Sequence, residues 1–322
     1  MSPDPQTAAH APAVDVRTLV DPEMLPALES FQLPTMNAES VAAIRNTPFP
    51  PLPLSDAVTR TDHVVPGDPP VPVRVHRPVD YEGTLPAILT IHGGGYVIGS
   101  YDMDDMLLDH WCPLLGIAGV SVDYRLAPET PYPGPLEDCD AALRWTHEHA
   151  DELGIDPTRL GVYGLSAGGG LAAGLALLAR DRDRPFAFQL LDCPMLDDRQ
   201  SSPSIRAEGL YVWSAESNEF GWRSYLGELY GSDDVPPYAA AFRATDLTGL
   251  PPSCVVVGSI DGFRDEDIDY AQRLNQAGVP CELHVLAGLP HAYLMAPTAP
   301  AVQLAAHCMD DWLARQLARL SA

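Results

Sequence analysis

The sequence contains no lysine, so all 19 of its basic residues are arginines. This absence excludes enzymes that work through a lysine Schiff base, including those with pyridoxal phosphate, and it excludes the phosphate-binding lysine of a Walker loop. The arginines are also outnumbered by 44 acidic residues, which gives a formal net charge of −25. Because such a charge repels phosphate backbones and anionic lipid headgroups, we expect no nucleic-acid partner.

Long hydrophobic runs and paired cysteines are missing as well. The apolar runs fall well short of the roughly 20 residues that span a bilayer, so we expect no membrane span. The six cysteines are far apart and form no CxxC pair, as is typical of reduced thiols. No cluster of His, Cys and Asp has metal-ligand spacing, so we expect no metal and no other cofactor. No basic start with an apolar core precedes Arg17, and we therefore expect a cytoplasmic protein.

What is present is a chain of 322 residues with globular proportions, 46% hydrophobic and 20% charged. After about residue 56, the chain alternates short apolar runs with amphipathic segments. This alternation predicts a mostly parallel central sheet with helices on both faces. The expected strands are 87–91, 119–124, 160–163, 186–191, 254–257 and 282–286. The expected helices are 135–153, 166–180 and two that begin near Asp265 and Ala301.

Two stretches do not follow this alternation. Two short helical patterns begin at Asp21 and Asn37, and a proline-rich linker, residues 47–56, follows them. Residues 197–248 form a second irregular stretch, which contains tryptophans, tyrosines and prolines. We expect a single α/β domain over the whole chain, with a small helical cap made of about residues 1–46 and part of 197–248.

Ser166 lies in a Gly-x-Ser-x-Gly sequence, from Gly164 to Gly168, between an expected strand and an expected helix. A nucleophilic serine in this context stands on a sharp turn that leaves no room for side chains two positions before and after it. The start of the following helix also points backbone N–H groups at negative charge. The motif predicts a serine nucleophile, and the alternative is a glycine-rich turn in which the serine only caps the helix.

The sequence HGGGY, which begins at His92, follows the first expected strand at the edge where the loops of an α/β sheet gather. Three glycines let backbone N–H groups approach a ligand closely. Together with the N–H of Ala167, these groups are expected to stabilise a tetrahedral oxyanion. The alternatives are a flexible surface turn and a phosphate loop that lacks its lysine.

A serine hydroxyl is a weak nucleophile near neutral pH and needs a base that a carboxylate orients. Among ten histidines, His291 follows the last expected strand in a loop from which its ring can reach inward, whereas His284 lies within that strand. Asp261 follows the strand 254–257, and the acidic residues after it fit the start of a helix. We therefore predict catalytic roles for Ser166, Asp261 and His291, which stand in the chain order of α/β hydrolases.

Five ordered motifs make the chain similar to the hormone-sensitive-lipase branch of the esterases, the bacterial family IV carboxylesterases. The motifs are HGGGY from His92, DYRLAPE from Asp123, GLSAGGG from Gly164, DGFRDED from Asp261 and PHAY from Pro290. Within that branch, the chain resembles heroin esterases and acetyl esterases. The resemblance implies an α/β-hydrolase fold with a cap, and it assigns the oxyanion N–H groups to Gly94, Gly95 and Ala167.

The residues and the resemblance together predict a serine carboxylesterase that hydrolyses short-acyl esters through an acyl-enzyme intermediate. An amidase or lactonase would use the same residues, and a ligand receptor would keep the fold without turnover. The expected partner is a small-molecule ester, and a homodimer is compatible with the sequence. Trp213, Trp222 and Tyr225 are expected either to line a closed apolar pocket or to pack the cap onto the main domain.

Overall fold

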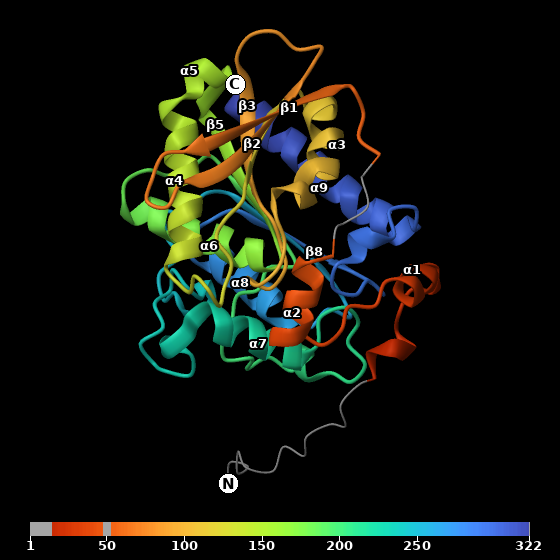
Figure 1. Cartoon of the computed structure of the whole chain (residues 1–322). Coiled ribbons are helices and arrows are strands. Elements are labelled where there is room, and N and C mark those ends of the chain that lie inside the picture. The colour runs from red at the N-terminus through yellow and green to blue at the C-terminus, as the bar shows by residue number, and fades with distance from the viewer. Residues whose placement is uncertain (1–14, 48–52, 322) are drawn as a thin grey trace.

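An eight-stranded sheet runs through the middle of the computed structural model, with the strand order β1-β2-β4-β3-β5-β6-β7-β8 (Figure 1). The strands are β1 (Val58–Val65), β2 (Val71–Pro78), β3 (Leu85–Ile91), β4 (Ala118–Val122), β5 (Ile155–Leu165), β6 (Gln189–Asp192), β7 (Ser253–Gly258) and β8 (Cys281–Leu286). β2 is antiparallel to β1 and to β4, and all other neighbours are parallel. The expected mostly parallel sheet is confirmed.

The structure describes residues 15–47 and 53–321. Residues 1–14 of the expected cap and residues 48–52 of the expected linker therefore lie outside the described part of the chain. Among the described residues, no helix combines the length and the apolar character that crossing a bilayer requires.

Helices cover both faces of the sheet. Those on one face are α3 (Asp105–Leu115) and α9 (Pro300–Leu320), and those on the other are α4 (Gly134–Glu148), α6 (Ala167–Asp181) and α8 (Arg264–Gln276). Successive strand residues point to opposite faces, so Ile88 joins the core with α3 and α9 while Leu89 joins the other core. A strand buried on both faces reads as a continuous apolar run, which is why β3, β4 and β7 could be predicted from the sequence.

Sequence analysis missed the hairpin of β1 and β2 and misplaced several boundaries, including the start of β5, which was expected at residue 160 and lies at Ile155. Val71, Val73 and Val75 alternate with other residues, a pattern typical of a strand with one apolar face. The expected helix 135–153 is two helices, α4 and the short α5 (Ala150–Leu153), with His149 between them. β6 begins three residues later than expected, although Ala187 and Phe188 already share backbone hydrogen bonds with β5.

The two irregular stretches meet at one end of the molecule. The first contains α1 (Leu25–Ser30) and α2 (Ala38–Arg45), and the second contains α7 (Ala215–Leu226). α2 and α7 lie close together in Figure 1, and the N–H of Met36 donates to Ser217 Oγ at 3.0 Å. The N–H of Val16 donates to the carbonyl of Glu208 at 3.0 Å. Segments about 180 residues apart in the chain are thus joined directly.

Candidate active site

The predicted site residues lie in loops at the carboxyl ends of parallel strands. Ser166 follows β5, Asp261 follows β7 and His291 follows β8. Because parallel strands end at the same edge, these loops come together in space. Ser166 Oγ lies 2.9 Å from His291 Nε2, and His291 Nδ1 lies 2.8 Å from Asp261 Oδ2. The structure therefore brings all three predicted residues into one hydrogen-bonded chain.

Ser166 stands on a strained turn. Its φ of 56° and ψ of −116° lie outside the regions that side-chain-bearing residues normally occupy. Its N–H donates to the carbonyl of Asp192 at 2.8 Å, which holds the turn in place. A Cβ on Gly164 would overlap the backbone of Gly168, and a Cβ on Gly168 would overlap the backbone of Ile91. Both glycines of the motif are therefore required by close backbone approach.

Asp261 uses both carboxylate oxygens. Oδ1 accepts a hydrogen bond from the N–H of Phe263 at 2.9 Å, and Oδ2 faces the His291 ring. The Phe263 ring meets the His291 ring edge to face, with centroids 5.0 Å apart. When Nδ1–H donates to the carboxylate, Nε2 is left to accept the Ser166 proton. Ser166, Asp261 and His291 are only 5%, 2% and 5% exposed. Their hydrogen bonds therefore lie in surroundings poor in water, where electrostatic interactions are strong.

Sequence reasoning missed Asp192, which links the serine turn to the histidine loop. Its carbonyl binds the Ser166 N–H, and its carboxyl accepts hydrogen bonds from Tyr293 at 2.6 Å and Tyr163 at 3.3 Å. Burial raises the pKa of Asp192 to about 6, and the two tyrosine hydroxyls oppose that rise. Its position at the carboxyl end of β6 is the signal that could have identified it.

The glycine loop after β3 presents backbone N–H groups. Gly94 and Gly95 have φ values of 110° and 59°, and Ala167 is the first residue of α6. In the described part of the chain, no acceptor binds the N–H of any of these three residues. These are the donors that an oxyanion would need.

His92 supports this loop from inside the protein. Its ring stacks on Tyr124 at a centroid distance of 4.1 Å, and Nδ1 donates to the carbonyl of Gly93 at 2.8 Å. Complete burial lowers the pKa of His92 to about 4, so the ring is neutral at neutral pH. It is thus a support of the loop and not a second base.

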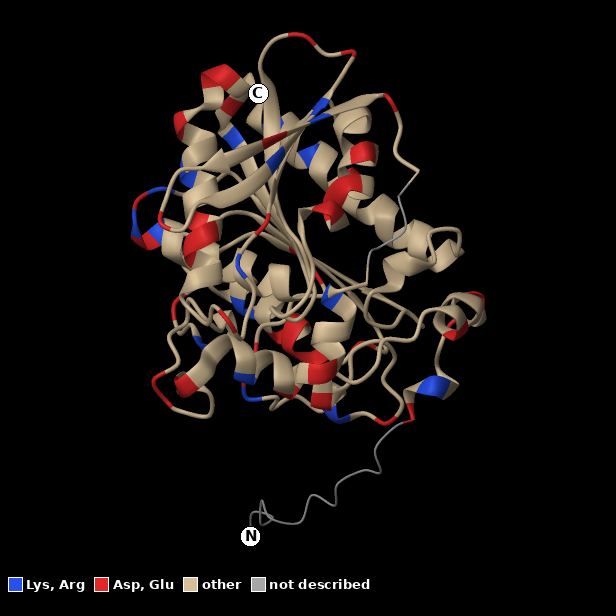
Figure 2. Cartoon of the chain, in the orientation of Figure 1, with Lys and Arg blue, Asp and Glu red and all other residues tan. Residues whose placement is uncertain are grey.

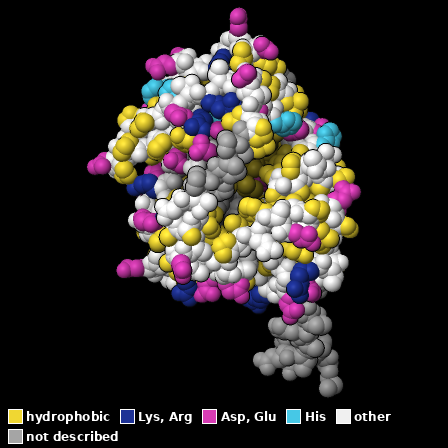
Figure 3. All heavy atoms as spheres, turned by 45° about the vertical axis from the view of Figure 1, so that its right-hand side comes forward, with side chains coloured by type: hydrophobic (Ala, Val, Ile, Leu, Met, Phe, Trp, Pro, Cys, Tyr) yellow, Lys and Arg dark blue, Asp and Glu magenta, His cyan; other side chains and the backbone are white. Residues whose placement is uncertain are grey.

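A cavity of about 150 Å³ opens beside Ser166 and His291. Its other lining residues are Phe31, Leu33, Ile44, Gly93, Gly94, Gly95, Ile98, Gly99, Met103, Leu165, Val212, Trp213 and Ala292. On the face drawn in Figure 3, hydrophobic side chains border a hollow. Of the three aromatic residues expected to line a pocket, Trp213 does so, whereas Trp222 and Tyr225 pack on Tyr96 instead.

One group of side chains in the described residues is close enough to hold a metal ion. Cys193, Asp261 and His291 have candidate ligand atoms within 4.8 Å of one another. However, Asp261 and His291 are already paired by a hydrogen bond, and burial and nearby carboxyls raise the pKa of the Cys193 thiol well above its usual range. This chemistry favours a hydrogen-bonded pair over a metal centre.

Comparisons with known proteins agree with this geometry. A family model described as the alpha/beta hydrolase fold matches residues 88–295. Esterase LipI of Mycobacterium tuberculosis is 34% identical, covering 87% of this chain and 89% of LipI. The ethyl acetate hydrolase of Pseudomonas putida is 32% identical, covering 91% of this chain and 92% of that protein. The solved structure of a bacterial heroin esterase is 40% identical with a TM-score of 0.86, and the match covers 93% of this chain and 98% of that one.

The chain therefore belongs to the α/β-hydrolase family. Within that family it is similar to esterases over most of its length, which confirms the expected fold class and the resemblance to hormone-sensitive-lipase-like carboxylesterases.

Proposed function

We propose that the protein is a serine carboxylesterase that hydrolyses small, uncharged esters. The observation that carries this proposal is the hydrogen-bonded chain of Ser166, His291 and Asp261 beside an apolar cavity. An imidazole that binds a serine hydroxyl at one nitrogen and a carboxylate at the other activates that hydroxyl for acyl transfer. The similarity to esterases supports the same chemistry.

The reaction takes two half-reactions. Ser166 Oγ attacks the ester carbonyl carbon while His291 Nε2 takes the hydroxyl proton, and Asp261 stabilises the imidazolium that forms. The bond to the alcohol oxygen then breaks, and His291 gives that oxygen the proton. In the second half, His291 takes a proton from water as the water attacks the acyl group. The bond to Ser166 Oγ breaks, the serine recovers its proton, and a carboxylic acid leaves.

In both tetrahedral intermediates the carbonyl oxygen becomes negatively charged. We assign its stabilisation to the N–H groups of Gly94, Gly95 and Ala167, because they lack an internal acceptor in the described residues. Removing one donor of this kind typically lowers kcat by roughly 10² to 10³.

The lining of the cavity supports a neutral substrate with a short acyl chain. Among the described residues that line it, none carries an Asp, Glu or Arg side chain. A charged substrate group would lose its hydration there without gaining a partner. Each CH₂ that fits contributes about 0.8 kcal/mol, whereas crowding a filled cavity costs roughly 1 to 3 kcal/mol. A volume of about 150 Å³ leaves little room for long chains.

We further propose that the described residues before 48 and part of 197–248 act as a cap. Phe31 and Ile44 line the cavity from the first segment, and Trp213 lines it from the second. Arg45 ties the first segment to the glycine loop, since its guanidinium donates to the carbonyl of Val97 at 2.7 Å. A cap in this position would limit substrate size and exclude water.

An amidase, a lactonase and a ligand receptor remain the alternative functions. Matched ester, amide and lactone substrates separate the first two from an esterase. A receptor would bind an ester without releasing acid, so turnover of a chromogenic acetate ester excludes it.

We also propose a cytoplasmic location, which the six free cysteines support. We further propose a homodimer, which light scattering would detect as twice the monomer mass.

The test of the proposed function is kcat/KM for p-nitrophenyl esters from acetate to palmitate, with Ser166→Ala as control. We expect an optimum at acetate to butyrate and a fall beyond it. Ser166→Ala should lower kcat by about 10⁴-fold or more while the circular dichroism spectrum is retained. An optimum at long chains would contradict the small pocket, and full turnover by Ser166→Ala would contradict the mechanism.

A further inference from the structure

The segment before α7 reaches the site through a strained backbone. Val212 has a φ of 67°, in the left-handed region that β-branched residues rarely adopt. The next residue, Trp213, is 4% exposed, and its ring lies so close to Gly95 that a Cβ on this glycine would overlap it. Backbone strain of this kind persists only where the surrounding structure holds it. The contact between Trp213 and Gly95 is therefore a fixed feature of the site.

Helix α7 contacts the same glycine directly. A Cβ on Gly221, in the middle of α7, would lie 2.9 Å from the carbonyl oxygen of Gly95 and 3.4 Å from both Met195 Cε and the Trp213 ring. A glycine within a helix costs about 1 kcal/mol relative to alanine. Close approach to the glycine loop accounts for its presence at this position.

The same face of α7 also contacts Tyr96, the residue after Gly95. Four buried residues share this face at helical spacing, namely Asn218, Gly221, Trp222 and Tyr225. The Tyr225 ring stacks on Tyr96 at 4.0 Å, and the Trp222 ring lies 5.3 Å from it. Asn218 Oδ1 accepts a hydrogen bond from Trp213 Nε1 at 3.3 Å. One helix face thus contacts Gly95, Tyr96 and Trp213.

We propose that α7 positions the oxyanion-binding loop, an inference that rests on the proposed esterase function. Gly221 is the positioning residue that sets the direction of the Gly95 N–H. Gly95 has no side chain, so only contacts to its backbone hold it. A displacement of its carbonyl or Cα moves its N–H with it. Since a developing oxyanion depends on donor position more than a neutral ester carbonyl does, α7 acts mainly on the transition state.

The experiment adds a single methyl group at the contact. Gly221→Ala is compared with Ser224→Ala, a half-buried position on the same helix outside this face. For p-nitrophenyl acetate, we expect Gly221→Ala to lower kcat by about 10²-fold, the effect of losing one oxyanion donor, with KM changed by less than about threefold. Affinity for a trifluoromethyl ketone, which forms a tetrahedral adduct on the serine, should fall in proportion to kcat/KM. The melting temperature should change by only a few degrees, because the gain of about 1 kcal/mol in helix propensity offsets part of the strain at the contact.

Wild-type kcat and wild-type ketone affinity in Gly221→Ala would overturn the proposal. A lower kcat with unchanged ketone affinity would overturn it as well, since a positioning role acts through the oxyanion. If Gly221→Ala does not fold, the same measurements apply to Tyr225→Leu, which removes the ring stacked on Tyr96, with Tyr225→Phe expected to restore wild-type values. Wild-type protein that neither hydrolyses esters nor binds the ketone would instead refute the proposed function, whatever the variants do.

Discussion

The backbone of Ser166 has a φ of 56°, and Gly164 and Gly168 make this turn possible because neither position has space for a Cβ. The two glycines are close to Ser166 in the sequence, so the motif alone was enough to predict the turn. Asp192 and Tyr293 could not be predicted in the same way. Their hydrogen bond joins residues 101 positions apart, so although Asp192 follows an expected strand and Tyr293 lies in the PHAY motif, neither position indicates its partner.

The orientation of the His291 ring depends on Asp261. We expect Asp261→Asn to lower kcat by about 10⁴-fold, because the amide favours the wrong ring tautomer and does not stabilise the imidazolium. The melting temperature should change little, which would show that the loss of rate is not caused by unfolding. The measurement is kcat for p-nitrophenyl acetate together with a thermal melt, and a kcat within tenfold of wild type would exclude Asp261 as the orienting carboxylate.

Asp104 makes stability depend on pH. Burial, with a smaller contribution from Asp105, raises its pKa from 3.8 to about 7, against the effect of a hydrogen bond from Thr90. Between these two values the folded protein holds a proton that the unfolded chain has released. The stabilisation is thus fully present below about pH 4 and is lost as the pH rises to about 7.

We therefore expect Asp104→Asn to reduce the fall in unfolding free energy between pH 4 and pH 7, by a few kcal/mol at about 1.4 kcal/mol per pH unit. Urea titrations of both proteins across this range measure the difference. Parallel pH dependences of wild type and variant would show that Asp104 does not titrate as described.

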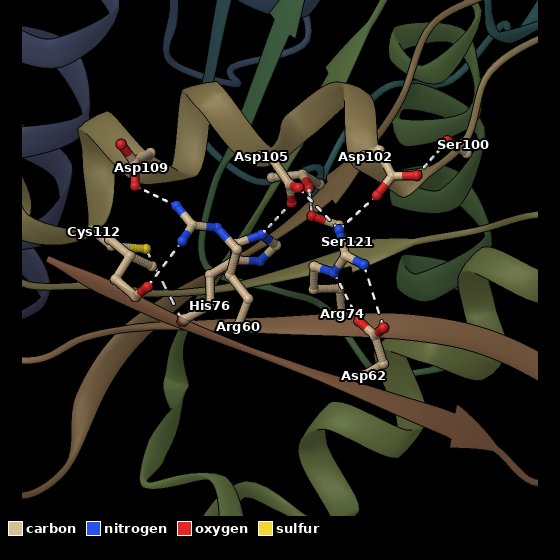
Figure 4. A network of polar contacts seen from close by, with 12 residues as sticks. Arg60, Asp62, Arg74, His76, Ser100, Asp102, Asp105, Asp109, Cys112 and Ser121 are labelled. Atoms are coloured by element: carbon tan, nitrogen blue, oxygen red, sulfur yellow. Dashed lines mark hydrogen bonds and ion pairs between the residues drawn. The ribbon is translucent and has the colours of Figure 1, made fainter. Parts of the chain in front are cut away.

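At the scale of elements, the hairpin of β1 and β2 packs on α3 through charges, as Figure 4 shows. Arg74 on β2 binds Asp105 at 2.9 Å and Asp102 at 2.6 Å, and His76 Nε2 lies 2.8 Å from the other oxygen of Asp105. Arg60 on β1 pairs with Asp109 on α3. β2 thus has one apolar face, with Val71, Val73 and Val75, and one polar face, and this alternation was present in the sequence although no strand was predicted there.

Two aspartates that bind the same arginine differ in burial, which gives a matched pair of variants. The Asp105 side chain is 7% exposed and the Asp102 side chain is 62% exposed. We expect Asp105→Ala to lower the free energy of unfolding by about 2 kcal/mol or more, since it leaves the buried His76 ring without its hydrogen-bond partner and takes the most buried of three carboxylates from Arg74. Asp102→Ala should cost less than about 1 kcal/mol. Equal effects in chemical denaturation would contradict the role of burial.

At the scale of the whole molecule, the site could be predicted although Ser166 and His291 are 125 residues apart. The parallel sheet brings the carboxyl ends of its strands to one edge, so motifs that follow strands must meet there. The packing of α7 against Gly95 could not be predicted. It depends on where an irregular segment folds back, and no periodic pattern encodes that.

The net charge of −25 is also a property of the whole molecule. Figure 2 shows acidic positions in all parts of the fold, so no single region accounts for the charge. Mutual repulsion should destabilise the folded state at low ionic strength, and the Debye length shrinks to about 10 Å at 0.1 M salt. We expect the melting temperature to rise between very low and moderate ionic strength. A flat or falling melting temperature would show that local ion pairs outweigh the overall repulsion.

The central claim is that Ser166 is the nucleophile, and a phosphonate ester with a p-nitrophenol leaving group tests it most directly. We expect one equivalent of p-nitrophenol to be released as ester hydrolysis is lost in parallel. Peptide mass spectrometry should place the single adduct on Ser166, and Ser166→Ala should release none. Complete loss of hydrolysis with Ser166 unmodified, or an adduct on another residue, would contradict the account.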